Sequence, residues 1–205
     1  MKKKQKKCRG YMLSPQLPCH SNPVEVVPGL FCGSENDFMD GIGNGLCLDT
    51  LVPLNHLDGF IWDTGFRGEI LYYPIKDYSV LPPDILELLV AEIIDRINAG
   101  KKVGVFCLGG HGRTGYIASI VLGKMGTEDP IGLLREKYCK SAVESTEQIK
   151  HIADVLHKPE LAKKYVVQKM DRYPYDLEHY YSSYSHNGYE EGFWDFMDIP
   201  EDTQD

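Results

Sequence analysis

The sequence predicts an α/β fold in which helices flank a central, mostly parallel sheet. Short apolar segments rich in β-branched residues alternate with longer segments whose apolar residues recur at helical spacing. The clearest pair is the amphipathic stretch after Pro82-Pro83 and the buried-strand pattern of residues 103–106, which are separated by Gly100. With 205 residues, 42% of them hydrophobic, the chain is long enough for one domain with terminal extensions.

The apolar segments before residue 82 are expected to be strands. Residues 24–31 are predicted to open the fold as a strand with a turn at Pro28-Gly29, because β-branched residues dominate the segment. The glycine-rich residues 37–45 are predicted to form a loop. Further short strands are expected over residues 46–51, 59–62 and 70–75.

Between residues 82 and 172, apart from the strand over residues 103–106 and the loop that follows it, the chain is predicted to be mainly helical. Proline is tolerated in a first helical turn, and acidic groups there suit the helix dipole. Ser145 and Gln148 have the spacing of a capping box, in which each residue caps the other's backbone. Helices are expected to begin at Pro82, near Arg113, at Asp129-Pro130, at Thr146 and after Pro159.

Charge is distributed unevenly around a net value of −8. Residues 171–205 contain ten acids and one base, whereas residues 2–7 contain five lysines. The body is only mildly acidic and predicts no nucleic-acid partner; the lysine cluster could contact RNA or an anionic membrane, but a solvated tail is the simpler interpretation. No apolar run is long enough to cross a bilayer, and no signal-type apolar segment follows the lysines, so a cytoplasmic location is expected.

The six cysteines do not form the strongest zinc or redox spacings, because no Cys-x-x-Cys pair occurs. Cys8 and Cys19-His20 could supply half of a metal site, but no metal ion or cofactor is predicted. Without an export signal, reduced thiols are expected.

The strongest chemical signal lies between Val103 and Gly115. A strand leads to Cys107, a loop with three glycines follows, and a helix begins near Arg113. Glycines let backbone N–H groups turn inward, and such a nest at a helix N-terminus binds a phosphate dianion. The same field favours the reactive thiolate of Cys107, while the planar guanidinium of Arg113 can hold two phosphate oxygens. The hydroxyl of Thr114 can donate to the sulfur and stabilise it as a leaving group.

With this loop the sequence resembles the protein tyrosine phosphatase superfamily, whose signature is Cys, five residues, Arg, then Ser or Thr. It is most similar to the dual-specificity branch and its relatives with a His-Gly-Arg-Thr-Gly ending. The segments PGLFCGSENDF, PIKDYSVLPP and AVESTEQIKHI follow the order of that family, between about residues 24 and 156.

The resemblance implies a fold of the cysteine-phosphatase type that needs no metal ion. It makes Cys107 the nucleophile, Asp77 the general acid and Gln148 a candidate to attend the hydrolytic water. Asp63 is the rival acid, but it lies further from the loop in sequence. His111 would face the entrance and add positive charge when protonated. The expected phosphate-binding residues are Leu108, Gly109, Gly110, His111, Gly112 and Arg113.

One residue departs from the family pattern: Phe106 stands where these enzymes usually have histidine, which helps to hold the loop and activate the thiol. The leading hypothesis is a cysteine-dependent phosphomonoester hydrolase that acts on phosphoproteins through a phosphocysteine. An RNA 5′-phosphatase or a phosphoinositide phosphatase of the same fold is the alternative. Phe106 favours a third hypothesis, a pseudophosphatase that only binds phosphorylated partners.

Composition and periodicity also divide the chain. Residues 1–23 are predicted to be an irregular basic segment, 24–158 the catalytic domain, 159–172 a C-terminal helix and 173–205 an acidic, tyrosine-rich tail. The tail is interpreted as a solubilising extension. A sharper hypothesis is that it docks weakly at the positive phosphate pocket of the same chain.

Overall fold

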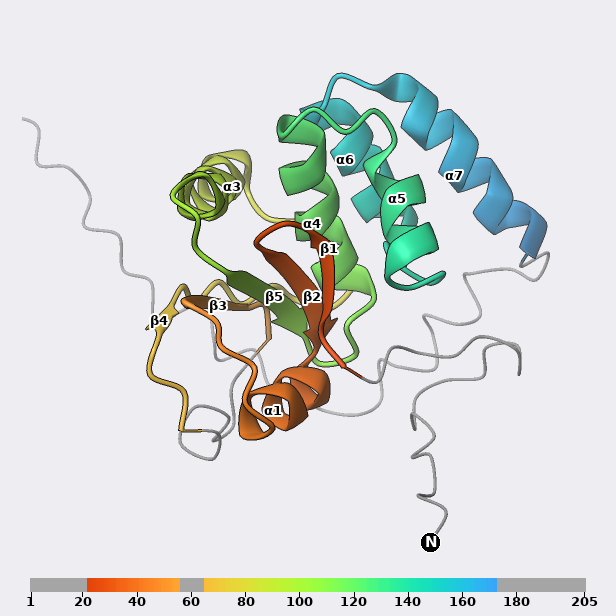
Figure 1. Ribbon diagram of the computed structural model, residues 1–205. Helices are drawn as coiled ribbons and strands as arrows, with labels where there is room; N and C mark the ends of the chain where they lie inside the picture. Colours follow the sequence, from red (N-terminus) through yellow and green to blue (C-terminus); the bar gives the residue numbers. More distant parts are fainter. Residues whose placement is uncertain (1–21, 56–64, 173–205) are drawn as a thin grey trace, which may run out of the picture. The chain divides into compact units, whose positions relative to one another are not determined.

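The computed structural model describes residues 22–55 and 65–172, which form a five-stranded sheet with helices on both faces (Figure 1). One compact unit extends to Lys169, and the site described below lies within it. Among the described strands, the β1–β2 pair is antiparallel and the other pairings are parallel, which confirms the mostly parallel sheet. In spatial order the strands are β1 (Val24–Val27), β2 (Leu30–Ser34), β5 (Val103–Cys107), β3 (Thr50–Pro53) and β4 (Glu69–Ile70).

Strand β5 occupies the centre of the sheet. It pairs with β2 on one side and β3 on the other, and its five residues are all buried. Because side chains alternate along a strand, Val103, Val105 and Cys107 share one face, while Phe106 points to the opposite face. The apolar run of residues 103–106 is therefore explained by burial on both faces, as predicted.

The helices cover the two faces of the sheet unequally. α1 (Glu35–Gly43) packs on one face beside β2 and β5, where Phe31, Phe38, Leu51 and Phe106 form a small apolar cluster. The opposite face carries the larger core, in which α3 and α4 contact β5 and α5 and α6 pack against α4 (Figure 1). These helices are α3 (Pro83–Asn98), α4 (Gly112–Lys124), α5 (Pro130–Lys137) and α6 (Thr146–Val155), with α7 (Pro159–Arg172) after them.

The predicted loop over residues 37–45 is wrong, because α1 begins at Glu35. Ser34 caps this helix: its hydroxyl accepts from the N–H of Asp37, whose carboxylate accepts from the N–H of Ser34 at 2.7 Å. The glycines of this segment lower helix propensity, but the capping box and the buried ring of Phe38 outweigh them.

Two expected strands are displaced or shortened. The strand predicted over residues 46–51 lies at Thr50–Pro53, because Leu46 and Leu48 pack on the cluster beneath α1. The strand predicted over residues 70–75 is regular only at Glu69–Ile70, and Pro74 lacks the N–H that a ladder needs. The segment still runs beside β3, since Leu71, Tyr73 and Ile75 donate backbone N–H groups to the carbonyls of Leu51, Pro53 and Leu54. The strand expected over residues 59–62 lies outside the described residues.

The predicted turn after β1, the end of α3 and the cap of α6 agree with the structure. The Pro28-Gly29 turn separates β1 from β2, with Gly29 at φ 87°, and Gly100 follows the end of α3. The Ser145–Gln148 capping box opens α6. None of the helices in the described part of the chain is long and apolar enough to cross a membrane.

Candidate active site

Cys107 lies at the carboxyl end of β5, where the strand leads into the glycine-rich loop. It is opposite Ser34 in the register of β2 and β5, and it is 3% exposed. Cys32 lies on the same face, opposite Val105. Burial raises the pKa of the Cys32 thiol well above its ordinary value, and the nearby Cys107 raises it further, so Cys32 stays a neutral thiol.

The loop after Cys107 is fixed by contacts from the segment that follows α5. Gly110 has φ 75°, a conformation that only glycine adopts easily, and its carbonyl accepts the hydroxyl of Tyr138. The carbonyl of His111 accepts the N–H of Gly115 and, at 3.2 Å, the N–H of Val143. His111 precedes α4 without a side-chain cap, so the first turn of α4 provides N–H groups for an anion.

Gly112 lies close to two side chains near the start of α6, so a larger residue here would require the carboxylate of Glu144 to shift. A Cβ at this position would lie 2.8 Å from Oε2 of Glu144 and 3.4 Å from Oε1 of Gln148. The segment before α6 is therefore packed directly against the start of α4. Glu144 was not singled out from the sequence, because nothing in its neighbourhood links it to a loop over thirty residues earlier.

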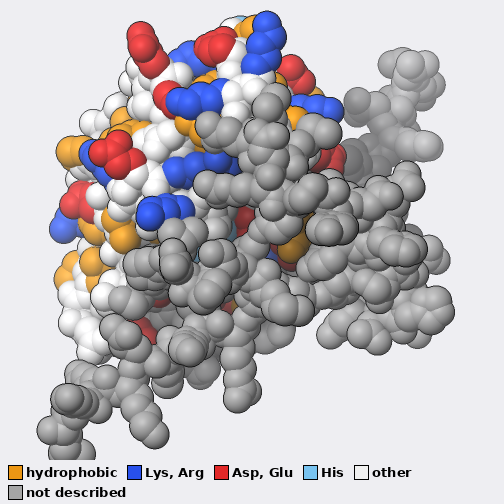
Figure 2. Space-filling view, turned by 90° about the vertical axis from the view of Figure 1, so that its right-hand side faces the viewer, with side chains coloured by type: hydrophobic (Ala, Val, Ile, Leu, Met, Phe, Trp, Pro, Cys, Tyr) orange, Lys and Arg blue, Asp and Glu red, His pale blue; other side chains and the backbone are white. Residues whose placement is uncertain are grey.

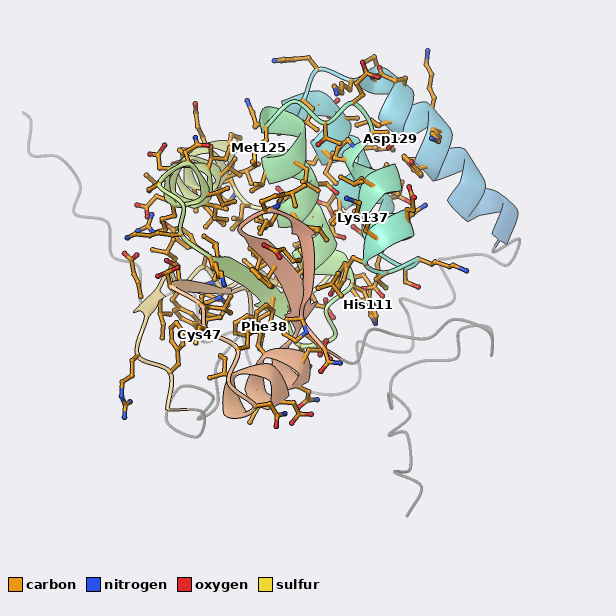
Figure 3. All side chains as sticks on the ribbon, viewed as in Figure 1. Phe38, Cys47, His111, Met125, Asp129 and Lys137 are labelled. Carbon is orange, nitrogen blue, oxygen red and sulfur yellow. The ribbon has the colours of Figure 1, made fainter. Side chains whose placement is uncertain are left out.

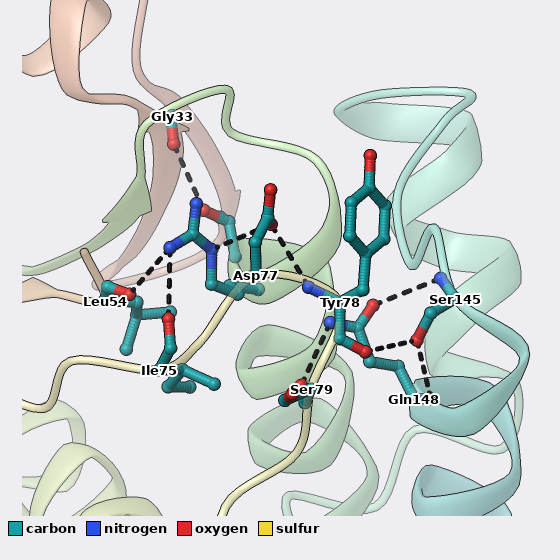
Figure 4. Close-up of polar contacts among 10 residues, drawn as sticks. Gly33, Leu54, Ile75, Asp77, Tyr78, Ser79, Ser145 and Gln148 are labelled. Atoms are coloured by element: carbon teal, nitrogen blue, oxygen red, sulfur yellow. Dashed lines mark hydrogen bonds and ion pairs between the residues drawn. The ribbon is translucent and has the colours of Figure 1, made fainter. Parts of the chain in front are cut away.

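The guanidinium of Arg113 is held by backbone carbonyls. Its Nη1 donates to the carbonyl of Ile75 at 3.1 Å and more weakly to that of Leu54 at 3.5 Å (Figure 4). The side chain is 10% exposed. Its Nε is buried and makes no hydrogen bond within the described residues. Since Nη1 is anchored, the edge formed by Nε and Nη2 is the one available for two oxygens of an anion.

Asp77 lies next to this edge. Its Oδ1 is 3.4 Å from Nε of Arg113, close enough for an ion pair, and also accepts the N–H of Tyr78 at 3.2 Å (Figure 4). The Asp77 side chain is 59% exposed, so a bound substrate can reach it. The structure thus brings Asp77 and Arg113 together from two elements far apart in sequence. Asp63, the rival acid, lies outside the described residues.

Other expected site residues make contacts that the sequence did not predict. The Thr114 hydroxyl donates to the carbonyl of Gly33 at 3.4 Å. Nδ1 of His111 lies 3.1 Å from Sγ of Cys139, and Sγ of Cys139 accepts the N–H of Ser141.

Both ends of the Gln148 amide form hydrogen bonds with backbone groups. Its Oε1 accepts the N–H of Ser145, and its Nε2 donates to the carbonyl of Ser79. In the loop itself, Leu108 is 62% exposed and Gly109 is exposed, whereas Gly110 and Gly112 are buried.

Phe106 belongs to the small apolar cluster on the α1 face of the sheet. Its ring centroid lies 5.1 Å from that of Phe38, at an interplanar angle of 34°. Figure 3 shows Phe38 on this side of the sheet. Because Phe106 points away from the face of Cys107, its contribution here is to packing. Tyr138, which binds Gly110 from the other face, supplies a contact that holds the loop.

The described residues give no group of three or more His, Cys, Asp or Glu side chains arranged to hold a metal ion. The groups that the structure brings together at the loop are a thiol, a guanidinium, a carboxylate and a helix N-terminus.

Several solved phosphatase structures share this fold. Tk-PTP in its active form matches with a TM-score of 0.56 and 21% identity, over 67% of this chain and 97% of that one. DUSP15 matches with a TM-score of 0.57 and 14% identity, over 71% and 95%. The PTP-2 phosphatase of Cydia pomonella matches with a TM-score of 0.52 and 19% identity, over 68% and 90%. The fold is that of the protein tyrosine phosphatases.

The sequence comparisons define the family more narrowly. The chain belongs to the family described as Swiss Army Knife protein, DSP-PTPase phosphatase domain, whose model matches residues 41–161. Two proteins of Methanocaldococcus jannaschii are similar in sequence: uncharacterized protein MJECL20, 37% identical over 68% of this chain and 95% of its own length, and uncharacterized protein MJ0215, 35% identical over 67% and 87%. The predicted resemblance to the dual-specificity branch is confirmed, and the chain is a phosphatase of this type.

Proposed function

We propose that this phosphatase hydrolyses phosphomonoesters of proteins through a phosphocysteine formed on Cys107. The observation that carries the proposal is the convergence of three groups around one loop. A buried thiol precedes the uncapped N-terminus of α4, an anchored arginine leaves one edge open for an anion, and the exposed carboxylate of Asp77 lies beside that edge.

The first half-reaction follows from this arrangement. The thiolate of Cys107 attacks phosphorus, so that an S–P bond forms while the ester P–O bond breaks. The Nε and Nη2 edge of Arg113 and the N–H groups at the start of α4 stabilise the charge on the equatorial oxygens. Asp77, in its protonated form, gives its proton to the departing oxygen, and an alcohol or phenol leaves.

The second half-reaction restores the enzyme. Asp77, now a carboxylate, takes a proton from a water molecule whose oxygen attacks the phosphocysteine. The S–P bond breaks, inorganic phosphate is released and Cys107 returns to the thiolate. Over both steps one water is consumed for each ester, and no redox partner is needed.

Phosphoproteins are proposed as substrates in preference to RNA ends or phosphoinositides. On the described part of the face shown in Figure 2, Lys and Arg side chains are mixed with Asp and Glu. Exposed Lys137 and Lys140, for example, accompany exposed Glu136. A polyanionic substrate would favour a more uniform basic field.

Turnover of para-nitrophenyl phosphate by the full chain tests the proposal. Wild-type protein is expected to release phosphate steadily, whereas Cys107→Ser should lose turnover by at least about a thousandfold, because a hydroxyl is barely ionised at neutral pH. Mild acid quenching of wild type should trap a covalent phosphoryl group that the serine variant lacks. Turnover of Cys107→Ser within tenfold of wild type would exclude the nucleophile. Absence of turnover in wild type would favour the pseudophosphatase.

A further inference from the structure

The turn that carries Asp77 has a backbone conformation that needs support from outside. The N–H of Ser79 donates to the carbonyl of Lys76 at 3.1 Å, so residues 76–79 close a tight turn with Asp77 at its first corner. Tyr78, at the second corner, has φ 62°. A bulky residue in this left-handed region costs on the order of 1–2 kcal/mol relative to ordinary backbone. Because glycine or asparagine usually fills this corner, the turn is expected to open unless other contacts hold it.

Two buried side chains at the start of α6 supply those contacts. The hydroxyl of Ser145 donates to the carbonyl of Tyr78 at 2.9 Å, although the two residues are 67 positions apart. The Nε2 of Gln148 donates to the next carbonyl, that of Ser79, at 3.2 Å. Figure 4 shows Ser145 and Gln148 on the side of the turn away from Leu54 and Ile75, whose carbonyls hold Arg113. Ser145 and Gln148 are 5% and 0% exposed, so water competes little for these hydrogen bonds.

The hydroxyl of Ser145 makes a second hydrogen bond, and a substitution can remove one of the two bonds without the other. Its oxygen accepts the N–H of Gln148 at 3.0 Å and thereby caps α6. A hydroxyl has one proton to donate and lone pairs to accept. The cap uses a lone pair, and the contact with Tyr78 uses the proton. A side chain that accepts but cannot donate therefore keeps the cap and loses the contact with the turn.

The segment before α6 is bound to the phosphate loop as well. The N–H of Val143 donates to the carbonyl of His111, and Nε of Arg135 donates to the carbonyl of Ala142 at 3.1 Å. Ser145 lies two residues after Val143. One short stretch of backbone thus contacts the loop that carries Cys107 and, through Ser145, the turn that carries Asp77.

We propose that Ser145 is a positioning residue for the general acid: by donating to the carbonyl of Tyr78, it holds Asp77 beside Arg113. The inference rests on the proposed function, in which Asp77 protonates the leaving group. An acid works only within hydrogen-bond reach of the oxygen that departs. A displacement of about 1 Å can cost on the order of a hundredfold in rate. Losing the contact with Tyr78 should therefore impair proton delivery while leaving Cys107 and Arg113 in place.

Three substitutions at Ser145 separate the cap from the contact. Ser145→Asp keeps a strong helix cap but has no proton to donate as a carboxylate. Ser145→Thr keeps both, and Ser145→Ala removes both. Each full-length variant is assayed with para-nitrophenyl phosphate, whose leaving group needs little protonation, and with phenyl phosphate, whose leaving group needs more.

Ser145→Asp should lose about tenfold or more of kcat with phenyl phosphate and less than about threefold with para-nitrophenyl phosphate, while its melting temperature falls less than that of Ser145→Ala. Ser145→Thr should restore kcat on both substrates. Equal losses on the two substrates in Ser145→Asp, or full activity of that variant on both, would overturn the assignment.

A matched control removes a helix cap far from the acid. Asp129 accepts the N–H of Gly132 at the start of α5, and Figure 3 shows it well apart from His111. Asp129→Ala should lower the melting temperature and change kcat on the two substrates by the same factor. If Asp129→Ala also lost kcat selectively on phenyl phosphate, general destabilisation would explain the result for Ser145→Asp, and Ser145 would not be a positioning residue. Failure of the proposed function is a different result, since wild-type protein would then turn over neither substrate.

Discussion

Nε of Arg113 and Oδ1 of Asp77 are 3.4 Å apart, although the side chain of the arginine is almost fully buried and that of the aspartate is 59% exposed. The contact joins the N-terminus of α4 to the turn after β4. It places a carboxylate at the edge of the guanidinium that an incoming phosphate would use. If phosphate binds at Arg113 as proposed, this ion pair is redistributed when substrate binds, and the following predictions depend on both partners.

Arg113→Lys should be nearly as inactive as Arg113→Ala. The Nη1 of Arg113 is fixed by the carbonyls of Ile75 and Leu54, and only a planar guanidinium can keep that anchor while it offers two further donors. An ammonium has one nitrogen and must choose between the carbonyls and the phosphate. We expect kcat/KM for para-nitrophenyl phosphate to fall by at least about a hundredfold in both variants. Recovery of most activity with lysine would contradict the two-point clamp.

Asp77→Ala should impair the enzyme according to its leaving group. With para-nitrophenyl phosphate the loss should be modest, and with an alkyl phosphate it should reach about a hundredfold or more. The same pattern in Asp63→Ala would give the role to Asp63, and equal losses on both substrates would make Asp77 a structural residue.

Phe106→His tests whether the missing histidine limits catalysis. The ring at position 106 packs against Phe38 on the face of the sheet opposite Cys107, so an imidazole there would be buried among apolar side chains. The free energy of unfolding should fall by about 1–3 kcal/mol, measured by urea denaturation, and kcat should not rise. Phe106→Leu is the apolar control, and its stability loss comes from the cavity alone. A rise in kcat of tenfold or more in Phe106→His would show that the native phenylalanine restrains the nucleophile.

The contact of Asp129 with α7 is expected to weaken in acid. Burial alone would raise the pKa of this carboxyl, but hydrogen bonds from Lys164, Tyr165 and Gly132 outweigh it and hold the pKa below its ordinary value. A depressed pKa stabilises the fold above the unfolded value of about 4, and the contribution disappears as pH falls through the folded value. Asp129→Asn should therefore flatten the acid side of the curve of melting temperature against pH, below about pH 4.

The control for this prediction is Glu128→Gln, which changes the charge at the neighbouring exposed position by the same amount. It should leave the acid side of the curve as in wild type. If both variants flattened the curve equally, net charge rather than the contact of Asp129 would govern the acid transition.

Local signals predicted much of the fold because each is confined to a few residues. The strand before Cys107, the cap at Ser145 and the prolines that open α3 and α5 can each be read within one turn or strand. The sequence predicted a loop instead of α1 because the segment is rich in glycine. Its capping box was not recognised, because the residue at N3 is Asp37, whereas the usual pattern has Glu or Gln there.

The candidate site was predictable only where the family motif supplied the spacing. Cys107 and Arg113 share one loop, but Glu144, Tyr138 and Ser145 reach that loop or the Asp77 turn through tertiary contacts. The contact between Ser145 and Tyr78 depends on how α6 packs against α4, and no local pattern encodes that packing. Gln148 illustrates the same limit: the resemblance implies a role beside the hydrolytic water, but no local pattern indicated that its amide binds the backbone of Ser145 and Ser79.

Cys107 and Asp77 lie on backbone segments that open at different rates, because β5 lies at the centre of the sheet and the Asp77 turn is exposed. Backbone amides in a strand paired on both sides exchange with solvent only when the whole domain unfolds, whereas an exposed turn exchanges through small fluctuations. In deuterium-exchange measurements, Phe106 and Cys107 should be among the slowest positions, and the turn over residues 76–79 among the faster ones. A molecule opened at that turn would therefore keep its affinity for an oxyanion such as vanadate, even while it has lost the means to protonate a leaving group.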